Sequence, residues 1–186
     1  QKASFDALEK ELFPLLKEIG ILEEFSPKYA FYEGAIVYGG SNISQRLREL
    51  VKQWNRGVFF ANVYLLNGER PLDSPKEKEE LFLDIEGSFH EIKHPPKTES
   101  ERAIWLWENS PSLAPIRKKV QVYYVTVPMK DNPEGGKKLR PTTDDTIYAW
   151  LTLKPLAGRY LVVSSVPHIL RHGAVIETIA PKSYQF

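Results

Sequence analysis

The sequence predicts an α/β protein with a mostly parallel sheet and helices on both of its faces. Short apolar, β-branched runs alternate along the chain with segments in which apolar residues recur at helical spacing. Residues 35–38, 58–66, 119–127 and 160–164 are predicted as strands, and 180–186 as a short last strand. This alternation is typical of parallel strands that are joined by helical crossovers.

The predicted helices begin close to the ends of these strands. Apolar spacing predicts a helix over 43–54, directly after the first strand. Residues 98–101 (Thr-Glu-Ser-Glu) have the pattern of a capping box, and 142–145 open a further helix with cap-type residues and acids. A last helix is expected over 167–176. Residues 128–140 contain proline, glycine and several lysines, and we expect an exposed loop there.

The length of 186 residues fits one α/β domain with a sizeable core. Apolar residues at helical spacing over 5–19, interrupted by Pro14, predict a helical extension at the N-terminus. We therefore divide the chain into an N-terminal helical extension at 1–32 and a single domain at 33–186, on which the extension packs. The chain begins at Gln1 rather than Met, which leaves open whether a leader or anchor preceded it.

Composition excludes several classes of function. The 25 basic and 24 acidic side chains nearly cancel, so a nucleic-acid role has no overall electrostatic support. The absence of cysteine excludes disulfides, thiolate nucleophiles, zinc–thiolate sites and iron–sulfur clusters within this chain. No apolar run approaches the roughly 18 residues of a membrane span, and none is expected. The oligomeric state stays open.

The turn after the first strand is the first candidate site. Gly39 and Gly40 precede Ser41 and Asn42, either of which suits the N-cap of the following helix. A glycine pair at this position lets backbone N–H groups approach a ligand, and the helix N-terminus favours an anion. The alternative is that the glycines only make a tight turn, since no complete G-x-G-x-x-G or P-loop is present.

The end of the fourth strand is the second candidate site. Ser164 and Ser165 are followed by His168 and Arg171, which are three residues apart and so share a helix face. Together they could hold an anionic group, with the arginine bidentate and the histidine as donor or proton carrier. The alternative is that His168 caps the helix and Arg171 makes a surface ion pair.

A zinc site is a third hypothesis, because His90 to His94 spell H-E-x-x-H. Gly87 just before this motif and the proline pair at 95–96 just after it oppose the helix that such a site needs. His168 and His172 are also four apart, but they lack a nearby acid. We therefore expect no metal.

The order of these motifs resembles the YdcF/SanA/ElyC-like family, a bacterial group with a Rossmann-like α/β fold. The resemblance spans residues 33–180, and this chain departs from the family pattern at Asn67, Glu69, Thr142 and Thr146. The similar elements are Ala35–Gly40 with Arg46-Leu47, Asn67-Gly68-Glu69, Thr98-Glu99-Ser100, Thr142–Thr146 and Ser164–Arg171.

The resemblance implies a Rossmann-like three-layer sandwich with a pocket at the carboxyl ends of the strands. It implies a nucleotide-like or S-adenosylmethionine-like ligand and a role in bacterial envelope biogenesis, and it leaves a cytoplasmic or an exported location open. From the residues and the resemblance together we expect a small anionic ligand, with hydrolase or transferase activity undecided. The alternative is a non-catalytic envelope or interaction module whose pocket is vestigial.

The expected site residues lie at strand-to-helix junctions, which one parallel sheet brings together. His168 is the candidate general acid or base, and Arg46 and Arg171 supply charge. Carboxylates at helix starts have an alternative role, which is to complement the helix dipole. The expected ligand-binding residues are Gly39, Gly40, Ser41, Asn42, Arg46, Gly68, Glu69, Glu99, Thr143, Asp145, Ser164, Ser165 and Arg171.

Overall fold

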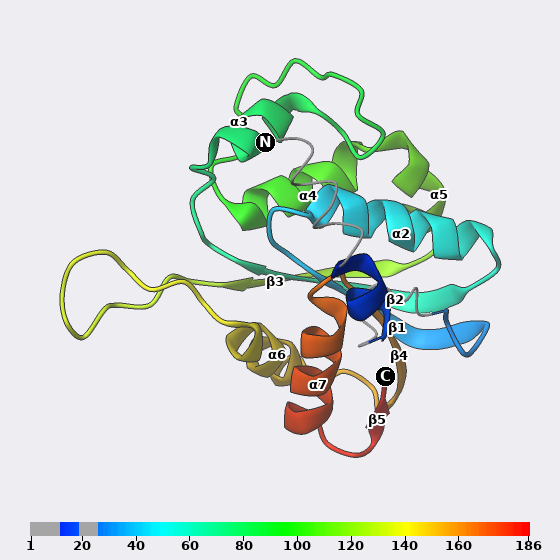
Figure 1. The fold of residues 1–186 in the computed structure, drawn as a ribbon. Coiled ribbons are helices and arrows are strands. Elements are labelled where there is room, and N and C mark those ends of the chain that lie inside the picture. The colour runs from blue at the N-terminus through cyan, green and yellow to red at the C-terminus, as the bar shows by residue number, and fades with distance from the viewer. Residues whose placement is uncertain (1–11, 19–25) are drawn as a thin grey trace.

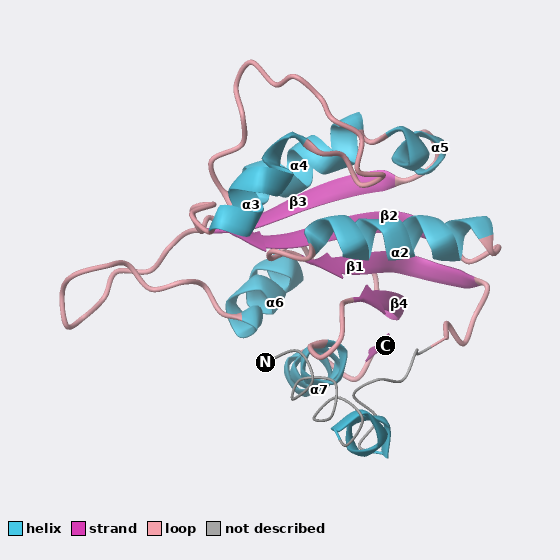
Figure 2. Ribbon diagram, turned by 45° about the horizontal axis from the view of Figure 1, so that its top comes forward, coloured by secondary structure: helices cyan, strands magenta, loops and turns pink. Residues whose placement is uncertain are grey.

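The computed structural model describes residues 12–18 and 26–186, and it confirms the predicted α/β class (Figures 1 and 2). Within these residues, five parallel strands form one sheet in the order β3-β2-β1-β4-β5. The elements are β1 (Phe31–Tyr38), α2 (Ile43–Asn55), β2 (Phe59–Gly68), α3 (Pro75–Glu79), η1 (Glu80–Phe82), α4 (Glu99–Asn109), η2 (Pro111–Leu113), α5 (Ala114–Arg117), β3 (Gln121–Val127), α6 (Thr143–Thr152), β4 (Gly158–Val163), α7 (Ile169–Ile179) and β5 (Tyr184–Gln185).

The central strand β1 is buried on both of its faces, as its continuous apolar run predicts. Ala35 and Val37 belong to the core on one side of the sheet, and Ile36 and Tyr38 to the core on the other. Successive side chains of a strand point to opposite faces, so an unbroken apolar run has to be covered twice. β1 pairs with β2 on one edge and with β4 on the other.

Helices provide this cover from two separate layers (Figure 1). α2 and α4 lie on one face, where Leu47 and Leu106 are fully buried. α6 and α7 lie on the opposite face, where Trp150 and Ile176 are fully buried. The result is the three-layer Rossmann-like sandwich that we expected. No helix in the described part of the chain has both the length and the apolar character needed to cross a bilayer.

The first strand begins at Phe31, earlier than predicted and inside the proposed extension at 1–32. Gly34 concealed this start, because glycine is depleted in strands. Here the glycine makes room for two rings, since a Cβ atom at Gly34 would lie 2.8 Å from both Tyr160 Cε1 and Tyr64 Cε2. Residues 12–18 are helical as predicted, and the rest of the helix predicted over 5–19 lies outside the described residues.

The two predicted helix caps are present, with one difference. Thr98 accepts a hydrogen bond from the Glu101 N–H, but the Glu101 carboxylate accepts from the N–H of Lys97 rather than of Thr98. Thr142 and Asp145 form a complete, reciprocal capping box at the start of α6. The carboxylate of Asp145 is therefore engaged in capping.

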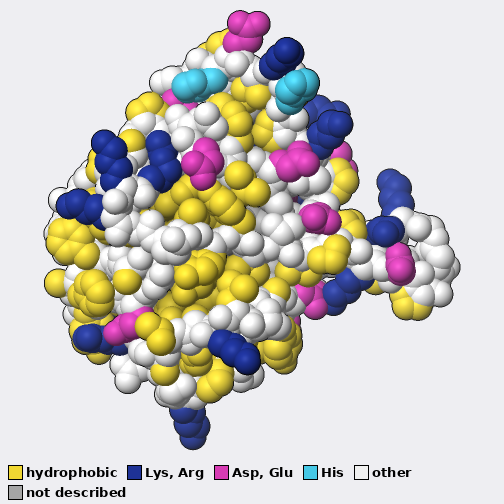
Figure 3. Space-filling model, turned by 180° about the vertical axis from the view of Figure 1, so that it is seen from behind, with side chains coloured by type: hydrophobic (Ala, Val, Ile, Leu, Met, Phe, Trp, Pro, Cys, Tyr) yellow, Lys and Arg dark blue, Asp and Glu magenta, His cyan; other side chains and the backbone are white. Residues whose placement is uncertain are grey.

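The predicted loop at 128–140 projects from the body of the protein as a hairpin (yellow in Figure 1). Backbone hydrogen bonds between Lys130 and Leu139 close it at its base. Figure 3 shows it from behind, with basic side chains along it. Pro141 follows at its root and packs against Gly68, where a Cβ atom would lie 2.5 Å from Pro141 Cγ.

The end of β1 fits against β2 only because residue 39 has no side chain. The Gly39 N–H donates to the Leu66 carbonyl over 2.7 Å. A Cβ atom at Gly39 would overlap Asn67 Oδ1 and lie 2.9 Å from the Leu66 oxygen. The close approach of the two strands thus explains this glycine.

Gly39→Ala is expected to lower the free energy of unfolding by about 1–3 kcal/mol, because the added methyl group overpacks a rigid backbone contact. Gly173→Ala is the matched control, since it lies within α7 with no heavy atom within 4 Å of its Cβ position. That change should raise the free energy of unfolding by about 0.5–1 kcal/mol. Equilibrium urea unfolding measures both, and an unchanged value for Gly39→Ala would contradict the packing argument.

Candidate functional site

The site lies at the carboxyl ends of β1 and β4, where the fold changes direction. The chain leaves β1 for α2 on one face of the sheet and leaves β4 for α7 on the other, so the ends of these adjacent strands form a crevice. A cavity of about 340 Å³ opens there, and we name it the strand-end cavity. It is lined by Tyr38, Gly39, Gly40, Ser41, Asn42, Arg46, Leu66, Gly68, Arg70, Glu99, Arg140, Pro141, Thr142, Thr143, Thr146, His168, Arg171 and His172.

Most of the residues expected from the sequence lie on this cavity. Gly39 to Asn42, Arg46, Gly68, Glu99 and Thr143 line it together with the candidate acid or base His168 and with Arg171. Glu69, Asp145, Ser164 and Ser165 do not belong to its lining. Glu69 is exposed, and the other three side chains bind groups within the protein.

The glycine turn presents unpaired backbone donors to the cavity. Gly40 has a φ of +106°, a conformation that disfavours any residue with a side chain. The N–H groups of Gly40, Ser41 and Asn42 have no hydrogen-bond partner among the described residues. They precede the 13-residue helix α2, whose dipole favours an anion at this end. The tight-turn alternative explains why glycine is required, and it is compatible with anion binding.

Asn42 occupies the N-cap position of α2, but its side chain does not cap the helix. Its Nδ2 donates to the Ser165 hydroxyl over 3.4 Å instead. The predicted N-cap position is therefore confirmed for Asn42, but without a capping hydrogen bond from its side chain. The amide of Asn42 turns toward the neighbouring strand end because Ser165 lies across the crevice.

Arg46 connects the two strand ends through hydrogen bonds, so its donors are already engaged within the protein. It is 3% exposed, and its Nη1 donates to the carbonyl oxygens of Tyr38 and Gly39. Its Nη2 and Nε donate to the Ser165 hydroxyl over 2.9 and 3.3 Å. Burial lowers the pKa of Arg46 to about 10, a value at which the side chain stays charged at neutral pH. Arg46 thus adds positive charge to the cavity wall while bracing it.

His172 positions Arg171, which is a role that the sequence did not reveal. Arg171 Nη2 lies 3.2 Å from His172 Nε2, and arginine can only donate, so Nε2 accepts. The proton is therefore on Nδ1, which donates to Ser164 Oγ over 2.7 Å. Burial, with Arg46 and Arg171 nearby, lowers the pKa of His172 to about 3 and keeps the imidazole neutral.

His168 and Arg171 face the cavity together, as their spacing predicted. Burial, followed by the charges of Arg46 and Arg171, lowers the pKa of His168, so its neutral form is favoured. His168 stands at the N-cap position of α7 but makes no capping hydrogen bond through its side chain. The alternative, in which Arg171 makes a surface ion pair, does not hold with any described carboxylate. A neutral imidazole beside an unpaired guanidinium suits proton transfer next to a bound anion.

Arg70 and Glu99 add an ion pair to the wall. Arg70 Nε donates to Glu99 Oε1 over 2.7 Å, and Arg70 Nη2 also contacts the carboxylate of Glu77. Burial raises the pKa of Glu99, and Arg70 opposes that rise. Asp145 is engaged in the capping box and with Lys130 Nζ at 2.6 Å, so it contributes to the helix start rather than to the cavity.

Sequence reasoning did not select Arg70, Arg140 or Thr146 as site residues. Arg70 follows Gly68 in the turn after β2, and Arg140 ends the loop before α6. Arg70 is next to Glu69, and Arg140 is two residues before Thr142, and both of these neighbours belong to motifs described above. Including two more residues on either side of each motif would have selected both arginines.

The zinc hypothesis fails on geometry. Residues 90–97 are not helical, so His90 and His94 do not share a helix face. His90 Nε2 instead lies 2.7 Å from Asp84 Oδ2. Within the described residues, no group of three or more histidine or acidic side chains is placed to hold a metal ion.

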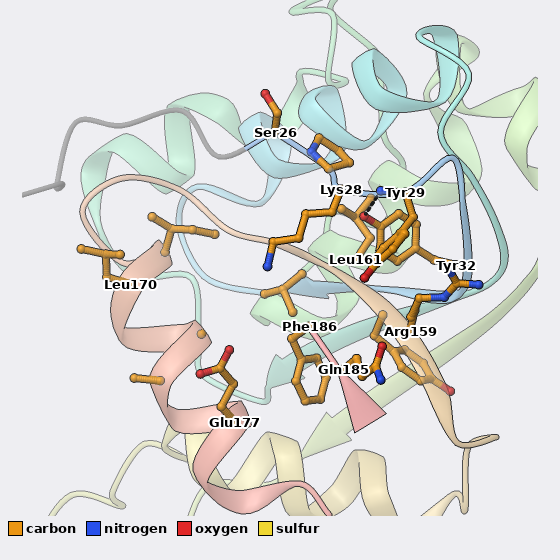
Figure 4. A pocket seen from close by; sticks show the side chains of 16 residues that line it. Ser26, Lys28, Tyr29, Tyr32, Arg159, Leu161, Leu170, Glu177, Gln185 and Phe186 are labelled. Atoms are coloured by element: carbon orange, nitrogen blue, oxygen red, sulfur yellow. Dashed lines mark hydrogen bonds between the residues drawn. The ribbon is translucent and has the colours of Figure 1, made fainter. Parts of the chain in front are cut away.

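A second cavity, of about 610 Å³, lies between α7, β4 and residues 26–29 (Figure 4). Its walls are mainly apolar, with Lys28 and Glu177 reaching toward it from different sides (Figure 4). It is the larger cavity, but volume alone does not define a binding site. The converging donors and charges are at the strand-end cavity.

No family model, curated protein or solved structure matches this chain at a significant level. The function is therefore inferred from the chemistry of the strand-end cavity.

Replacing His172 with glutamine is expected to weaken the acid sensitivity of the fold. The pKa of His172 falls from 6.5 to about 3 on folding, so as the pH drops through this window the unfolded chain takes up the proton first. The free energy of unfolding therefore decreases toward acid, and less steeply in His172→Gln.

Urea unfolding of the wild type and of His172→Gln at a series of pH values across this window measures the effect. His94→Gln is the matched control, because His94 is exposed, and it should keep the wild-type slope. Parallel curves for the wild type and His172→Gln would contradict the role assigned to His172.

Proposed function

We propose that the strand-end cavity binds a small ligand through a phosphate or similar anionic group. A nucleotide-like or another phosphorylated compound fits this description through its phosphate, and an S-adenosylmethionine-like compound fits it through its carboxylate. One observation carries the proposal: the free N–H groups of Gly40 to Asn42 and the guanidinium groups of Arg140 and Arg171 border the same cavity. Neither arginine is in an ion pair with a described carboxylate, so both are available to an anion.

The roles of the individual residues follow from their surroundings. The anionic group lies near the glycine turn, where the dipole of α2 favours negative charge. Arg171 contacts it in an orientation that His172 fixes. The neutral imidazole of His168 is the candidate general acid or base, in a hydrolase or transferase reaction of the bound ligand.

The motif order supports kinship with the YdcF/SanA/ElyC-like family and, through it, a role in the bacterial cell envelope. Motifs that resemble that family contribute residues to the cavity from the turns after β1 and β2, the starts of α4 and α6, and the start of α7. The kinship is part of the proposal and adds no residue to the site.

A non-catalytic interaction module is the second candidate function. The observation that favours it is that Arg46, Ser164 and Ser165 are satisfied within the protein. When some polar groups around a cavity are already hydrogen-bonded within the protein, fewer groups are left to bind a ligand. Turnover of a phosphorylated compound that depends on His168 would exclude this candidate.

Arg171→Ala is expected to weaken binding of the preferred anionic probe by about tenfold or more, because it removes a charge-assisted hydrogen bond. Inorganic phosphate, pyrophosphate and AMP are the anionic probes. S-adenosylmethionine is the fourth probe, and its carboxylate is its one anionic group. A probe that binds the native state raises the apparent melting temperature by mass action. Thermal shift identifies the preferred probe, and isothermal titration calorimetry gives its affinity.

Arg56→Ala is the matched control, since Arg56 is an exposed arginine at the opposite end of α2. That variant should keep the wild-type affinity. An equal loss of affinity in Arg56→Ala and Arg171→Ala, or an affinity that neither substitution changes, would refute the site. No shift with any probe would favour the interaction module.

A further inference from the structure

Glu99 is a carboxylate in a wall otherwise rich in cations. It is the first residue of α4, and its side chain is only 13% exposed. Arg46, Arg140 and Arg171 line the same cavity. Burial raises the pKa of this carboxyl group, and the Nε donor of Arg70, which binds Oε1, opposes that rise. Among the described residues, no hydrogen bond reaches the other oxygen, Oε2.

Gly40 keeps space open next to this carboxylate. A Cβ atom at Gly40 would lie 4.0 Å from Glu99 Oε1 and 3.7 Å from Arg46 Nη1. The Cβ position of Gly68 lies 3.8 Å from Glu99 Oε2, and Pro141 fills it, with its Cγ 2.5 Å away. A carboxylate oxygen and a guanidinium nitrogen therefore border the space over Gly40. Arg46 Nη1 already donates to two carbonyl oxygens, so Glu99 is the group of this pair that a ligand over Gly40 can still engage.

A bare phosphate does not use this half of the cavity, because it repels the carboxylate. An ionised carboxylate oxygen only accepts hydrogen bonds, so the group that meets Oε2 has to be a donor. An ammonium donor is disfavoured by the neighbouring arginines. A hydroxyl group donates without carrying charge, and it fits both constraints.

We infer that the ligand is the phosphate ester of a polyhydroxyl compound, such as a free sugar phosphate or the ribose phosphate of a nucleotide. Glu99 accepts a hydrogen bond from a hydroxyl group of this ligand. The inference rests on the proposed anion site, which holds the phosphate. Glu99 determines which phosphate ester is preferred, and Gly40 leaves the room that the polyol needs.

Isothermal titration calorimetry on the whole chain tests this with five probes: ribose 5-phosphate, propyl phosphate, O-phosphoethanolamine, inorganic phosphate and AMP. Ribose 5-phosphate is expected to bind about tenfold or more tightly than propyl phosphate, the ratio that one hydrogen bond to a charged group supplies. It should also bind more tightly than O-phosphoethanolamine. If AMP binds at least as tightly as ribose 5-phosphate, the ligand is a nucleotide. If AMP binds more weakly, the ligand is a free sugar phosphate.

Glu99→Gln should bring ribose 5-phosphate and propyl phosphate to within about threefold of each other. Propyl phosphate itself should bind the variant more tightly, because the repelling charge is gone. A purely structural role of Glu99 would instead weaken both ligands together. Glu77→Gln is the matched control, since Glu77 also binds Arg70 but does not line the strand-end cavity. It should preserve the wild-type preference.

The series on the wild-type chain decides the question even if a variant does not fold. Equal affinity for ribose 5-phosphate and propyl phosphate, with both sensitive to Arg171→Ala, overturns the role of Glu99 and leaves the anion site intact. Tightest binding of O-phosphoethanolamine overturns the assignment of a hydroxyl donor. Absence of Arg171-dependent binding for every probe overturns the proposed function together with this inference.

Discussion

A buried guanidinium holds together the two strand ends on which the site depends. Arg46, from α2, donates to carbonyl oxygens at the end of β1 and to the hydroxyl of Ser165 after β4. A charge this deeply buried is tolerated only where its donors find acceptors, so those acceptors have to keep their positions. The crevice between β1 and β4 therefore has a fixed shape, and the strand-end cavity inherits it.

The fold could be predicted because its signals are local. The apolar run of β1, the helical spacing of α2 and the capping box at Thr142 each depend on residues within one or two turns of chain. The parallel sheet then follows from the alternation of such elements. Where a local signal was misleading, as at Gly34, the cause was tertiary: two tyrosine rings from neighbouring strands occupy the place of its side chain.

Most of the residues selected from the sequence line the strand-end cavity, but the hydrogen bonds that already occupy some of their side chains could not be predicted. The contact between Arg46 and Ser165 spans 119 positions in the chain, and no local pattern encodes it. Arg102 is also engaged within the protein, with the carbonyl oxygens of Leu81 and Glu80, which are 21 and 22 positions away in the chain. A sequence pattern does not distinguish an arginine that is open to a ligand from one that already binds backbone. Ser164 was predicted to bind a ligand for the same reason, although its hydroxyl group accepts a hydrogen bond from His172.

The root and the tip of the hairpin at 128–140 have different surroundings. Its root supplies Arg140 and Pro141 to the cavity, whereas its tip, around Gly135 and Gly136, projects away from the body of the protein (Figure 1). Insertions at exposed loop tips are well tolerated, because little packing depends on them. The tip is thus a natural attachment point for a fluorophore. A label there would stay away from the cavity, because the residues of the tip do not line it.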